Sequence, residues 1–467
     1  MNVIDLRNEG REHSQIWGPG DHPLAAGGML FLSSKYKGTI MRIMETDTVV
    51  IGTGPGGATV ARELSKRGKK VVLLEKGKAR DWSVGTPLAY AAMYDIRRSK
   101  QGILVRRGIT PGGSTMIYSG NAYDPPAFLK EDLGIDLEAE VLETKKELGI
   151  RPVPGSFYRH HPGTRRLVEA AGEMGHAMKP QARFIDASLC DPHCDKCLFG
   201  CKKAAKWTAR SYVDEAVAHG TQLVTGCDVR GIIHSRGRVE GVLAETAKGA
   251  ITIRADRVVL AAGGMGTPEI LHRSGIKGAG THFFTDPMSV LVGEMKEGPG
   301  TFREITYTFA DESRKGEFVF GNVGAVNAFV AQVAAKNISA LPRGARMNKL
   351  AGMFVKLCDE PTGEIRKDGS FHKAFTPRDE HLMAQGIAAA KSVMVRAGVR
   401  PDTITVAKGI GGHPGGTAAI GRVVGTDLST DIENLYICDN SVMPISGGIP
   451  PVLTLIALAK QFARGLR

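Results

Sequence analysis

The stretch VVIGTGPGGATVARELSKRGKKVVLLEKG, residues 49–77, reads as an apolar strand, a glycine-rich turn, a helix and a second apolar strand. Gly52 permits a tight turn, Gly54 lets backbone N–H groups approach a pyrophosphate, and Gly57 allows close packing of the helix on the strand. The helix N-terminus adds free N–H donors and the positive end of its dipole. Glu75 ends the second strand, 18 residues after Gly57, where a carboxylate accepts both hydroxyls of a ribose. The unit predicts a dinucleotide site for a nucleotide without a 2′-phosphate.

Length, composition and charge are those of an ordinary globular protein. The chain has 467 residues, of which 42% are hydrophobic and 23% charged, enough for two domains or one large one. The net charge of +13 favours an anionic substrate, an acidic protein partner or a membrane surface, and is equally typical of a solvated basic surface. No Lys/Arg block with interleaved aromatic residues stands out, so nucleic-acid binding is not expected.

Neither a membrane span nor an export signal is apparent. The best apolar run, PPVLTLIALA at 450–459, is about half the length of a membrane span. The N-terminus lacks a basic and then apolar pattern that ends in a small-residue cleavage site. We therefore expect a cytoplasmic protein whose membrane contact is at most peripheral, and in that compartment disulfides are disfavoured.

The pattern of the sequence changes several times along the chain. Residues 1–44 show no sustained period and are predicted to be a poorly structured N-terminal extension, since Met41 or Met44 would be a natural start for the first strand. A second α/β stretch covers about 205–272. Between 286 and 360 longer alternating runs predict an antiparallel sheet with a different role.

Four further blocks resemble, in order, the glucose–methanol–choline (GMC) oxidoreductase family. They are PGGSTMIYSGNAYDPP (111–126), ADRVVLAAGGMGTPEILHRSGI (255–276), GGHPGGTAAIG (411–421) and ENLYICDNSVMPISGGIPPVLTLIALAKQFA (433–463). The resemblance implies FAD as the cofactor and an α/β fold. In that fold a Rossmann-like FAD-binding domain is assembled from separated segments, and an α+β substrate domain contains the antiparallel sheet.

The resemblance also implies where the domains lie and which residues meet the cofactor. The FAD-binding domain is expected at 45–125, 180–285 and 400–467, and the substrate or cap domain at 126–179 and 286–399. On the ADP half of the cofactor the resemblance implies Gly52, Gly54, Gly57 and Glu75, with Val229 at the adenine through its backbone. Near the isoalloxazine or ribityl chain it implies Gly113, Ser114 and Asn121. Near the ribityl and pyrophosphate groups it implies Asp439.

His413 is the candidate catalytic base. Oxidation of an alcohol to a carbonyl requires removal of the O–H proton and delivery of the C–H hydride to flavin N5, and a neutral histidine suits the proton step near pH 7. His413 precedes Pro414 in a glycine-rich turn, and the family resemblance makes it the proton acceptor. The alternative is a histidine that is satisfied by backbone carbonyls and has no catalytic role. His160, His161 and His381 are expected to be ordinary surface or packing residues.

The chain departs from the family pattern at one position. The family usually places a second His or Asn in the closing segment, across the substrate oxygen from the first His. Alignment of SGGIPPVLTLIALA puts Pro451 there, and proline has no side-chain donor or acceptor. Three interpretations stay open: His413 acts alone, another residue enters from the middle domain, or the reaction is not a simple alcohol oxidation.

The segment CDPHCDKCLFGC contains four of the seven cysteines: Cys190, Cys194, Cys197 and Cys201. Tetrahedral zinc usually takes two pairs of ligands separated by a longer loop, whereas an iron–sulfur cube suits closely spaced cysteines on one loop. The spacing is not that of the ferredoxin run, and Lys202 stands where that run has Pro. An iron–sulfur cluster, structural zinc and unligated thiols all stay open, with iron–sulfur favoured.

Some bacterial members of the GMC family carry a cysteine cluster near this position that holds iron–sulfur and passes electrons from the flavin. The resemblance therefore implies a short form of the family with a four-cysteine cluster, a dehydrogenase that feeds a one-electron acceptor protein. Cys227, Cys358 and Cys438 are isolated and are expected to be core residues.

Three functions remain in competition. The first is an FAD-dependent dehydrogenase acting on a small alcohol or a sugar-type hydroxyl. The second keeps the flavin but reduces or desaturates a C=C bond, and Pro451 is its best support. The third is a non-catalytic flavin and cluster module that docks on an acidic redox partner.

Overall fold

The glycine-rich turn joins the first two strands of a mixed sheet, and these two strands pair in parallel. In the computed structural model, which describes residues 42–466, β1 (Arg42–Ile51), α1 (Pro55–Lys66) and β2 (Val71–Glu75) follow each other as the sequence predicts. β1 and β2 pair in parallel from Thr48↔Val71 to Ile51↔Leu74. A Cβ atom at Gly57 would lie 2.0 Å from the carbonyl oxygen of Gly52, so the helix approaches the turn too closely for any side chain.

The first sheet has seven strands, which come from distant parts of the chain. Their order is β8-β2-β1-β11-β10-β9, and β20 pairs with β11. The new strands are β8 (Gln222–Thr225), β9 (Asp228–Ser235), β10 (Arg238–Thr246), β11 (Gly249–Leu260) and β20 (Leu435–Ile437). α1 packs against α7 (Ala209–Ala218) and α11 (Val452–Gly465), α4 (Glu138–Glu147) packs against α11, and α8 (Gly263–Arg273) contacts β9. The assembly of this layer from separated segments is confirmed.

The second sheet has eight strands, all antiparallel to their neighbours except β4 and β19. It runs in the order β3 (Tyr94–Arg98), β4 (Leu104–Gly108), β19 (Thr405–Gly411), β13 (Met288–Glu294), β16 (Leu350–Leu357), β15 (Phe318–Val323), β14 (Phe309–Asp311) and β6 (Lys179–Pro180). The antiparallel sheet predicted for the middle of the chain is thus confirmed.

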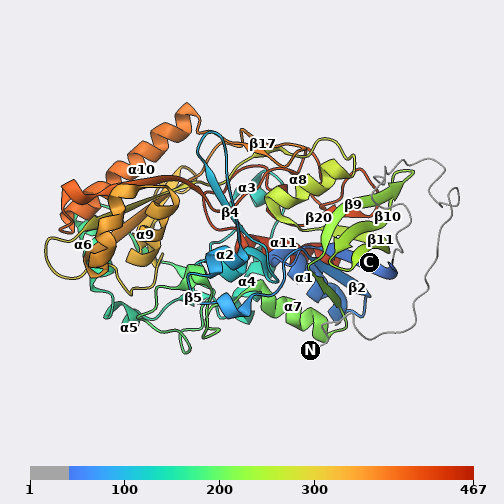
Figure 1. Ribbon diagram of the computed structural model, residues 1–467, viewed down its shortest axis with the longest axis horizontal. Helices are drawn as coiled ribbons and strands as arrows, with labels where there is room; N and C mark the ends of the chain where they lie inside the picture. The colour runs from blue at the N-terminus through green and yellow to red at the C-terminus, as the bar shows by residue number, and fades with distance from the viewer. Residues whose placement is uncertain (1–41, 467) are drawn as a thin grey trace.

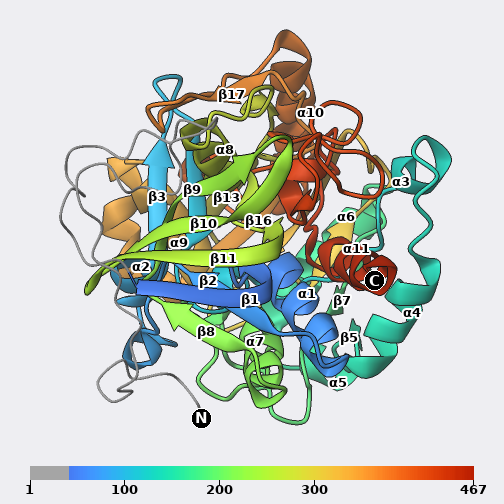
Figure 2. The ribbon, with the colours of Figure 1, turned by 90° about the vertical axis from the view of Figure 1, so that its right-hand side faces the viewer.

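Helices cover both faces of the second sheet. α10 (Pro377–Arg396) and α6 (Pro162–Glu173) bury Leu291 of β13, while α9 (Ala325–Ala334) packs over Val290 and Val292 of the same strand. Successive side chains of a strand point to opposite faces, and these residues follow that alternation. In Figure 1 these three helices lie together at one end of the molecule, and in Figure 2 strands of the first sheet face the viewer.

The strands do not follow the predicted domain boundaries throughout. β3, β4 and β19 belong to the second sheet, although their residues fall in the segments assigned above to FAD binding. β1 begins at Arg42 and so includes the last three residues of the predicted extension, 42–44, because its first residues pair with β11 from Arg42↔Ile251 onward. The rest of that extension, 1–41, lies outside the described residues.

The remaining elements are short. The helices are α2 (Ala89–Met93), α3 (Phe128–Glu131) and α5 (Gly155–Tyr158), and the strands are β5 (Arg151–Pro152), β7 (Ala182–Arg183), β12 (Thr281–Phe283), β17 (Gly363–Ile365) and β18 (Phe371–His372). Short 3-10 helices occupy Asp81–Ser83, Gly113–Ile117, Cys197–Phe199, Pro401–Thr403 and Asn440–Val442, and Ile338–Lys349 holds two further helical segments separated by a kink at Arg346. Within 42–466 the structure contains no helix with the length and apolar character needed to cross a membrane.

Two glycines in helices offer a matched test of this packing. Gly57→Ala should destabilise the protein by about 1–3 kcal/mol, because the new methyl group overpacks against the carbonyl of Gly52. Gly172→Ala, on an exposed position of α6 with no atom within 4 Å of its Cβ, should instead stabilise by about 0.5–1 kcal/mol. Urea unfolding of the two variants beside the parent measures both values, and equal stabilities would contradict the close approach.

Candidate active site

A cavity of about 300 Å³ lies between the two sheets and takes lining residues from both. On the side of the first sheet it is bounded by the ends of β1, β2 and β11, and on the side of the second by β4, β13, β16 and the turn after β19. In open α/β sheets, ligands bind outside the carboxyl ends of the parallel strands. The cavity stands at that position.

All but one of the residues predicted at the cofactor and base line this cavity. They are Gly52, Gly54, Glu75, Gly113, Ser114, Asn121, Val229, His413 and Asp439. Gly57 lies beneath, at the contact of α1 with the turn. Pro451 also lines the cavity, together with Pro450. The structure thus brings together residues from segments far apart in the sequence, and their individual roles are taken up below.

The dinucleotide end of the cavity has donors and space that suit FAD. α1 begins after Gly54 without a side-chain cap, so its first N–H groups are free for phosphate oxygens. A Cβ at Gly54 would meet no atom within 4 Å, which leaves room beside the turn. Gly113 comes so close that its Cβ would lie 2.9 Å from Gly54 Cα. The two glycine-rich loops therefore form one wall.

Glu75 is buried and already holds the turn. Its carboxylate accepts hydrogen bonds from the backbone N–H groups of Thr53 (3.2 Å) and Gly77 (2.7 Å), and also from the Thr53 hydroxyl. Burial raises the pKa of Glu75, and these donors oppose that rise. A carboxylate has about four acceptor positions, so one remains for a ribose hydroxyl.

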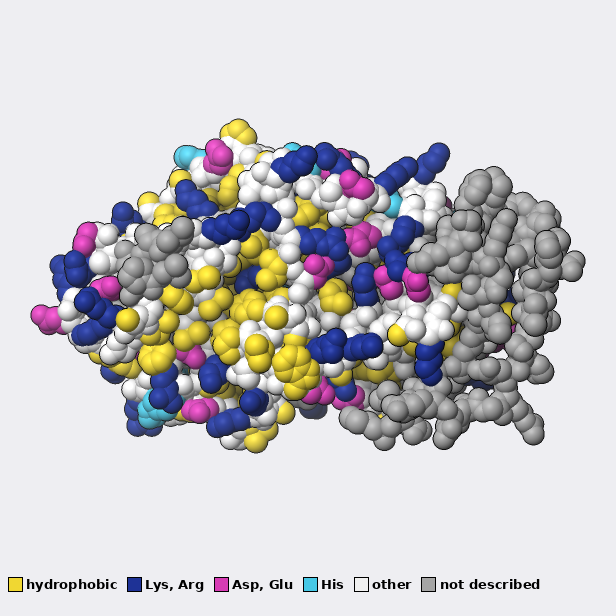
Figure 3. Space-filling view, in the orientation of Figure 1, with side chains coloured by type: hydrophobic (Ala, Val, Ile, Leu, Met, Phe, Trp, Pro, Cys, Tyr) yellow, Lys and Arg dark blue, Asp and Glu magenta, His cyan; other side chains and the backbone are white. Residues whose placement is uncertain are grey.

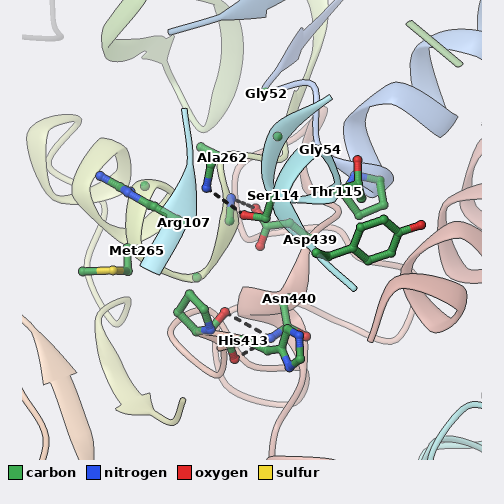
Figure 4. A pocket seen from close by; sticks show the side chains of 18 of the residues that line it. Gly52, Gly54, Arg107, Ser114, Thr115, Ala262, Met265, His413, Asp439 and Asn440 are labelled. Carbon is green, nitrogen blue, oxygen red and sulfur yellow. Dashed lines mark hydrogen bonds between the residues drawn. The ribbon is translucent and has the colours of Figure 1, made fainter. Parts of the chain in front are cut away.

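Asp439 occupies the next part of the cavity. It accepts hydrogen bonds from the backbone N–H groups of Gly263 (2.8 Å) and Ser441 (2.7 Å), and one from the hydroxyl of Thr267. Burial raises the pKa of this carboxyl group as well. Figure 4 shows Asp439 beside Ser114 and Ala262, with His413 and Asn440 grouped at a separate place.

His413 is held by its side chain and by its backbone. Its Nδ1 lies 2.8 Å from Oδ2 of Asp286. A carboxylate accepts, so Nδ1 carries the proton, and the described residues provide no hydrogen-bond partner for Nε2. The side-chain amide of Asn440 donates to the carbonyls of His413 (3.1 Å) and Pro414 (3.0 Å). The neutral ring therefore keeps Nε2 free to accept a proton in the cavity.

Asp286 is fixed by a chain of buried charges. Nζ of Lys356 lies 2.5 Å from its Oδ1, and Asp359 accepts a hydrogen bond of 2.8 Å from its backbone N–H. Lys373 in turn lies 2.8 Å from Asp359, and both side chains are fully buried. Asp286 has φ of +39°, a left-handed conformation that is uncommon for a residue with a side chain. The contact with Asp359 holds this backbone in place.

The electrostatic surroundings favour a neutral His413. Burial lowers its pKa, Asp286 raises it by charge and by hydrogen bonding, and the charges of Lys356 and Arg106 lower it again. The net result is a pKa below the ordinary range of histidine. The ring is therefore ready to accept a proton at neutral pH.

Asp286, Lys356, Arg106 and Asn440 also line or support the site, and the sequence analysis missed them. Only Asn440 carried a signal, because it follows Asp439 in the closing segment. Of the spare histidines, none lines the cavity: His161 is buried with Nε2 2.6 Å from the Pro192 carbonyl, and His381 contacts Gln385.

The four clustered cysteines lie on one loop beside the cavity, which Leu198 of that loop helps to line. All four are free thiols, and Cys197 is buried while the other three are half-buried. Burial raises the pKa of Cys190 to about 12, with contributions from the other three thiols. In the part of the chain that the structure describes, no three His, Cys, Asp or Glu side chains are arranged to hold a metal ion.

The isolated cysteines fit their predicted packing role only in part. Cys227 and Cys438 are buried, as expected, whereas Cys358 is half-buried. Cys227 also lines the cavity, next to Val229.

Comparison with known proteins identifies the family. Two GMC oxidoreductase family models match the chain, one at residues 46–294 and one at 359–459. The chain belongs to the GMC oxidoreductase family. It is an FAD-dependent oxidoreductase that acts on CH–OH donors.

Individual relatives are distant in sequence. An uncharacterised GMC-type oxidoreductase of Mycobacterium tuberculosis is 26% identical, over 90% of this chain and 76% of its own length. A long-chain-alcohol oxidase of Arabidopsis thaliana is 22% identical, over 89% of this chain and 67% of its own. Pyridoxine 4-oxidase ("Mesorbium loti") superposes with a TM-score of 0.67 at 15% identity, over 90% of this chain and 99% of its own. An Aspergillus oryzae formate oxidase superposes with a TM-score of 0.65 at 16% identity, over 90% of this chain and 98% of its own. These two structures confirm the fold.

The Asp286–His413 contact predicts a shifted pH profile. Asp286→Asn removes the charge that raises the pKa of His413, so the acid limb of activity should move to lower pH. The rate should also fall, about 100-fold or more, because the carboxylate no longer fixes the ring and its tautomer. The measurement is the rate of anaerobic flavin reduction by an alcohol between about pH 4 and about pH 9, a range that brackets the ordinary pKa of histidine.

A second Asp–His pair provides the control. Asp311 lies 3.5 Å from Nδ1 of His176, on the same sheet but outside the cavity. Asp311→Asn should leave the acid limb where it is. An unmoved limb in Asp286→Asn would show that Asp286 does not act through His413.

Proposed function

We propose that this chain oxidises the hydroxyl group of a small molecule to a carbonyl, with His413 as the proton acceptor. The observation that carries the proposal is the open Nε2 of His413 in a cavity that also contains the dinucleotide loop. FAD, when bound, supplies the hydride acceptor. The residues assigned to it from the sequence, from Gly52 to Asp439 and with the exception of Gly57, line one cavity, which supports this placement.

The chain's own residues account for the proton step. Nε2 of His413 accepts the hydroxyl proton as the C–H bond breaks, and the ring then carries a positive charge. Asp286, 2.8 Å from Nδ1, stabilises that charge, and the hydrogen bonds from Asn440 keep the turn fixed meanwhile.

Asp286 also supplies an interpretation of the missing second side chain. Proline stands at 450 and 451, so the closing segment offers no polar side chain across from His413 at these positions. Asp286 comes from the segment predicted as substrate domain and contacts His413 itself. We therefore favour an arrangement in which His413 alone faces the substrate oxygen and Asp286 orients the ring through Nδ1. The other arrangement, in which two side chains face that oxygen, is not the one we propose.

Relatives suggest the substrate class only broadly. The names of the relatives and structural neighbours refer to long-chain alcohols, pyridoxine and formate. A small alcohol is the reaction partner we propose for this chain. No contact in the described residues favours reduction of a C=C bond, which was the alternative suggested by Pro451.

A second candidate role is electron transfer through the cysteine loop. Two buried cations lie beside it: Lys206 donates to the carbonyls of Cys197 (2.9 Å), Tyr118 (2.7 Å) and Met116 (3.2 Å), and Arg183 donates only to carbonyls. Neither has a carboxylate partner in the described part of the chain. Buried cations without counter-charges are costly, and four thiolates on an iron–sulfur cluster would compensate them. We propose Cys190, Cys194, Cys197 and Cys201 as its ligands, with a one-electron acceptor protein as partner.

One face of the molecule carries apolar side chains that bear on contact with a membrane. Figure 3 shows hydrophobic side chains gathered at the middle of one face, with Lys and Arg distributed around them. Trp82 and Leu88 are among the exposed large apolar side chains, at 64% and 57%. We propose a cytoplasmic protein that can touch a membrane at most peripherally.

Removal of the His413 ring should slow the reaction without loss of the cofactor. His413→Ala should retain FAD and lower the rate of flavin bleaching by an alcohol about 10²- to 10⁴-fold. Stopped-flow absorbance under anaerobic conditions gives that rate. His381→Ala, on the exposed side of α10, serves as the control and should match the parent. Bleaching at the parental rate in His413→Ala would exclude this residue as the base.

The cysteine proposal has its own readout. The protein purified without oxygen should contain about four iron atoms per chain and give an EPR signal after reduction. Cys197→Ser should lose both while bleaching of the flavin by alcohol persists, and Cys358→Ser, outside the loop, should keep both. If the protein purified without oxygen contains no iron, whether or not it contains zinc, the electron-transfer proposal is refuted. The proposal of alcohol oxidation does not depend on this result.

A further inference from the structure

We propose that Arg106 binds an anionic group of the substrate, so that the alcohol oxidised here is a hydroxy-carboxylate with an apolar or aromatic body. The inference rests on the proposed function, since it concerns the same cavity. It depends on the place of Arg106, on the missing counter-charge and on the side chains around it.

Arg106 lies in the wall of the cavity, close to the base. It stands on β4, whose residues Leu104 and Val105 pair with Ile410 and Gly411 of β19. β19 ends at Gly411, two residues before His413, so β4 carries Arg106 alongside the turn of the base. Its charge is near enough to act on both His413 and Lys356. A group bound to Arg106 would therefore sit beside the reacting hydroxyl.

The guanidinium has no carboxylate within 4.0 Å among the residues that the structure describes. Two other arginines of the same hairpin each have a carboxylate partner: Arg97 lies 2.7 Å from Glu269, and Arg107 lies 2.8 Å from Asp95. Arg106 instead lies near the phenol groups of Tyr90, Tyr94 and Tyr307. Neutral phenols satisfy donors but do not balance the charge.

The charges at this end of the cavity sum to a positive value. Lys356 is balanced by Asp286 at 2.5 Å, and His413 acts in its neutral form. Arg106 is then the charge left over. Arg106 is half-buried in the cavity wall, and a cation that loses water without gaining a counter-ion is unfavourable. A guanidinium also presents paired donors that match a carboxylate. A substrate anion supplies what the described residues lack.

The rest of the wall fits a hydrocarbon or aromatic body. Tyr307 and Phe354 meet edge to face, with ring centroids 5.0 Å apart, and both line the cavity. Met288 and Leu198 add apolar surface. Such a wall binds by burial of apolar area, while a few polar groups set the orientation. The carboxylate on Arg106 and the hydroxyl at His413 would fix the two ends of the substrate.

The test compares ligands that differ only in charge. The holoenzyme is titrated with 4-methylbenzoate and with 4-methylbenzamide, neither of which carries a hydroxyl to oxidise, and the shift of the flavin absorption band reports binding. The parent should bind the benzoate on the order of 10- to 100-fold more tightly than the amide. Arg106→Gln should abolish the difference with amide binding unchanged, and Arg106→Lys should keep part of it. Arg98→Gln, an exposed arginine of the same hairpin, is the control and should match the parent.

Turnover gives the second arm, with 4-(hydroxymethyl)benzoate and 4-(hydroxymethyl)benzamide as substrates. The parent should show a kcat/KM for the benzoate on the order of 10- to 100-fold above that for the amide, carried mainly by KM. Arg106→Gln should bring the two values together.

The outcomes separate this inference from the proposed function. Bleaching by both alcohols without preference for the charged one, unchanged in Arg106→Gln, overturns the anion site and leaves alcohol oxidation in place. Arg106-dependent binding of 4-methylbenzoate without bleaching by any alcohol supports the anion site and refutes the proposed reaction. A lowered flavin midpoint potential in Arg106→Gln, with benzoate affinity unchanged, would assign the cation to the reduced flavin and overturn the inference.

Discussion

The hydrogen bond between Nδ1 of His413 and Asp286 is the contact on which the site depends. It decides which ring nitrogen faces the cavity. Asp286 keeps this position only because Asp359 holds its strained backbone and Lys356 balances its carboxylate. Removal of one member would leave a buried charge without a partner, which is among the costliest changes a protein interior can undergo. The proton transfer that we propose at this imidazole would thus rely on a series of ion pairs that extends into the second sheet.

The same region also fixes the base relative to the dinucleotide loop. β4 pairs in parallel with β19, which leads into the turn of His413. After β4 the chain turns back through Gly113, whose Cβ would lie 2.9 Å from Gly54 Cα. The strand pair therefore connects the base to the wall where the phosphates would bind. This explains why β3, β4 and β19, which lie within the segments assigned to FAD binding, belong to the second sheet.

The sequence was most informative where function requires local geometry. The turn at Gly52 and Gly54 needs particular residues at fixed spacing, so it could be predicted with its helix and both strands. Asp286 could not, because it lies 127 residues from His413 and meets it only after β13 and β19 pair. Nothing in the local sequence of an Asp-Pro pair shows which residue will face it. The domain boundaries were difficult for the same reason, since strand pairing between distant segments defines the second sheet.

The cations of the interior and of the cavity wall are of two kinds: some have a carboxylate partner, whereas others, among them the half-buried Arg106, do not. Lys356, Lys373 and Lys460 lie 2.5, 2.8 and 2.6 Å from carboxylates and need no other partner for their charge. Arg106, Arg183 and Lys206 have no such partner in the described part of the chain, and all three lie beside the cavity or the cysteine loop. Folding alone does not favour an unpaired interior charge, since an apolar residue of similar size would cost less. An anionic group beside these cations would supply the missing charge, as we propose above for the substrate at Arg106 and for the cysteine loop. Part of the excess of positive charge in the chain is then a property of the site and not only of the surface.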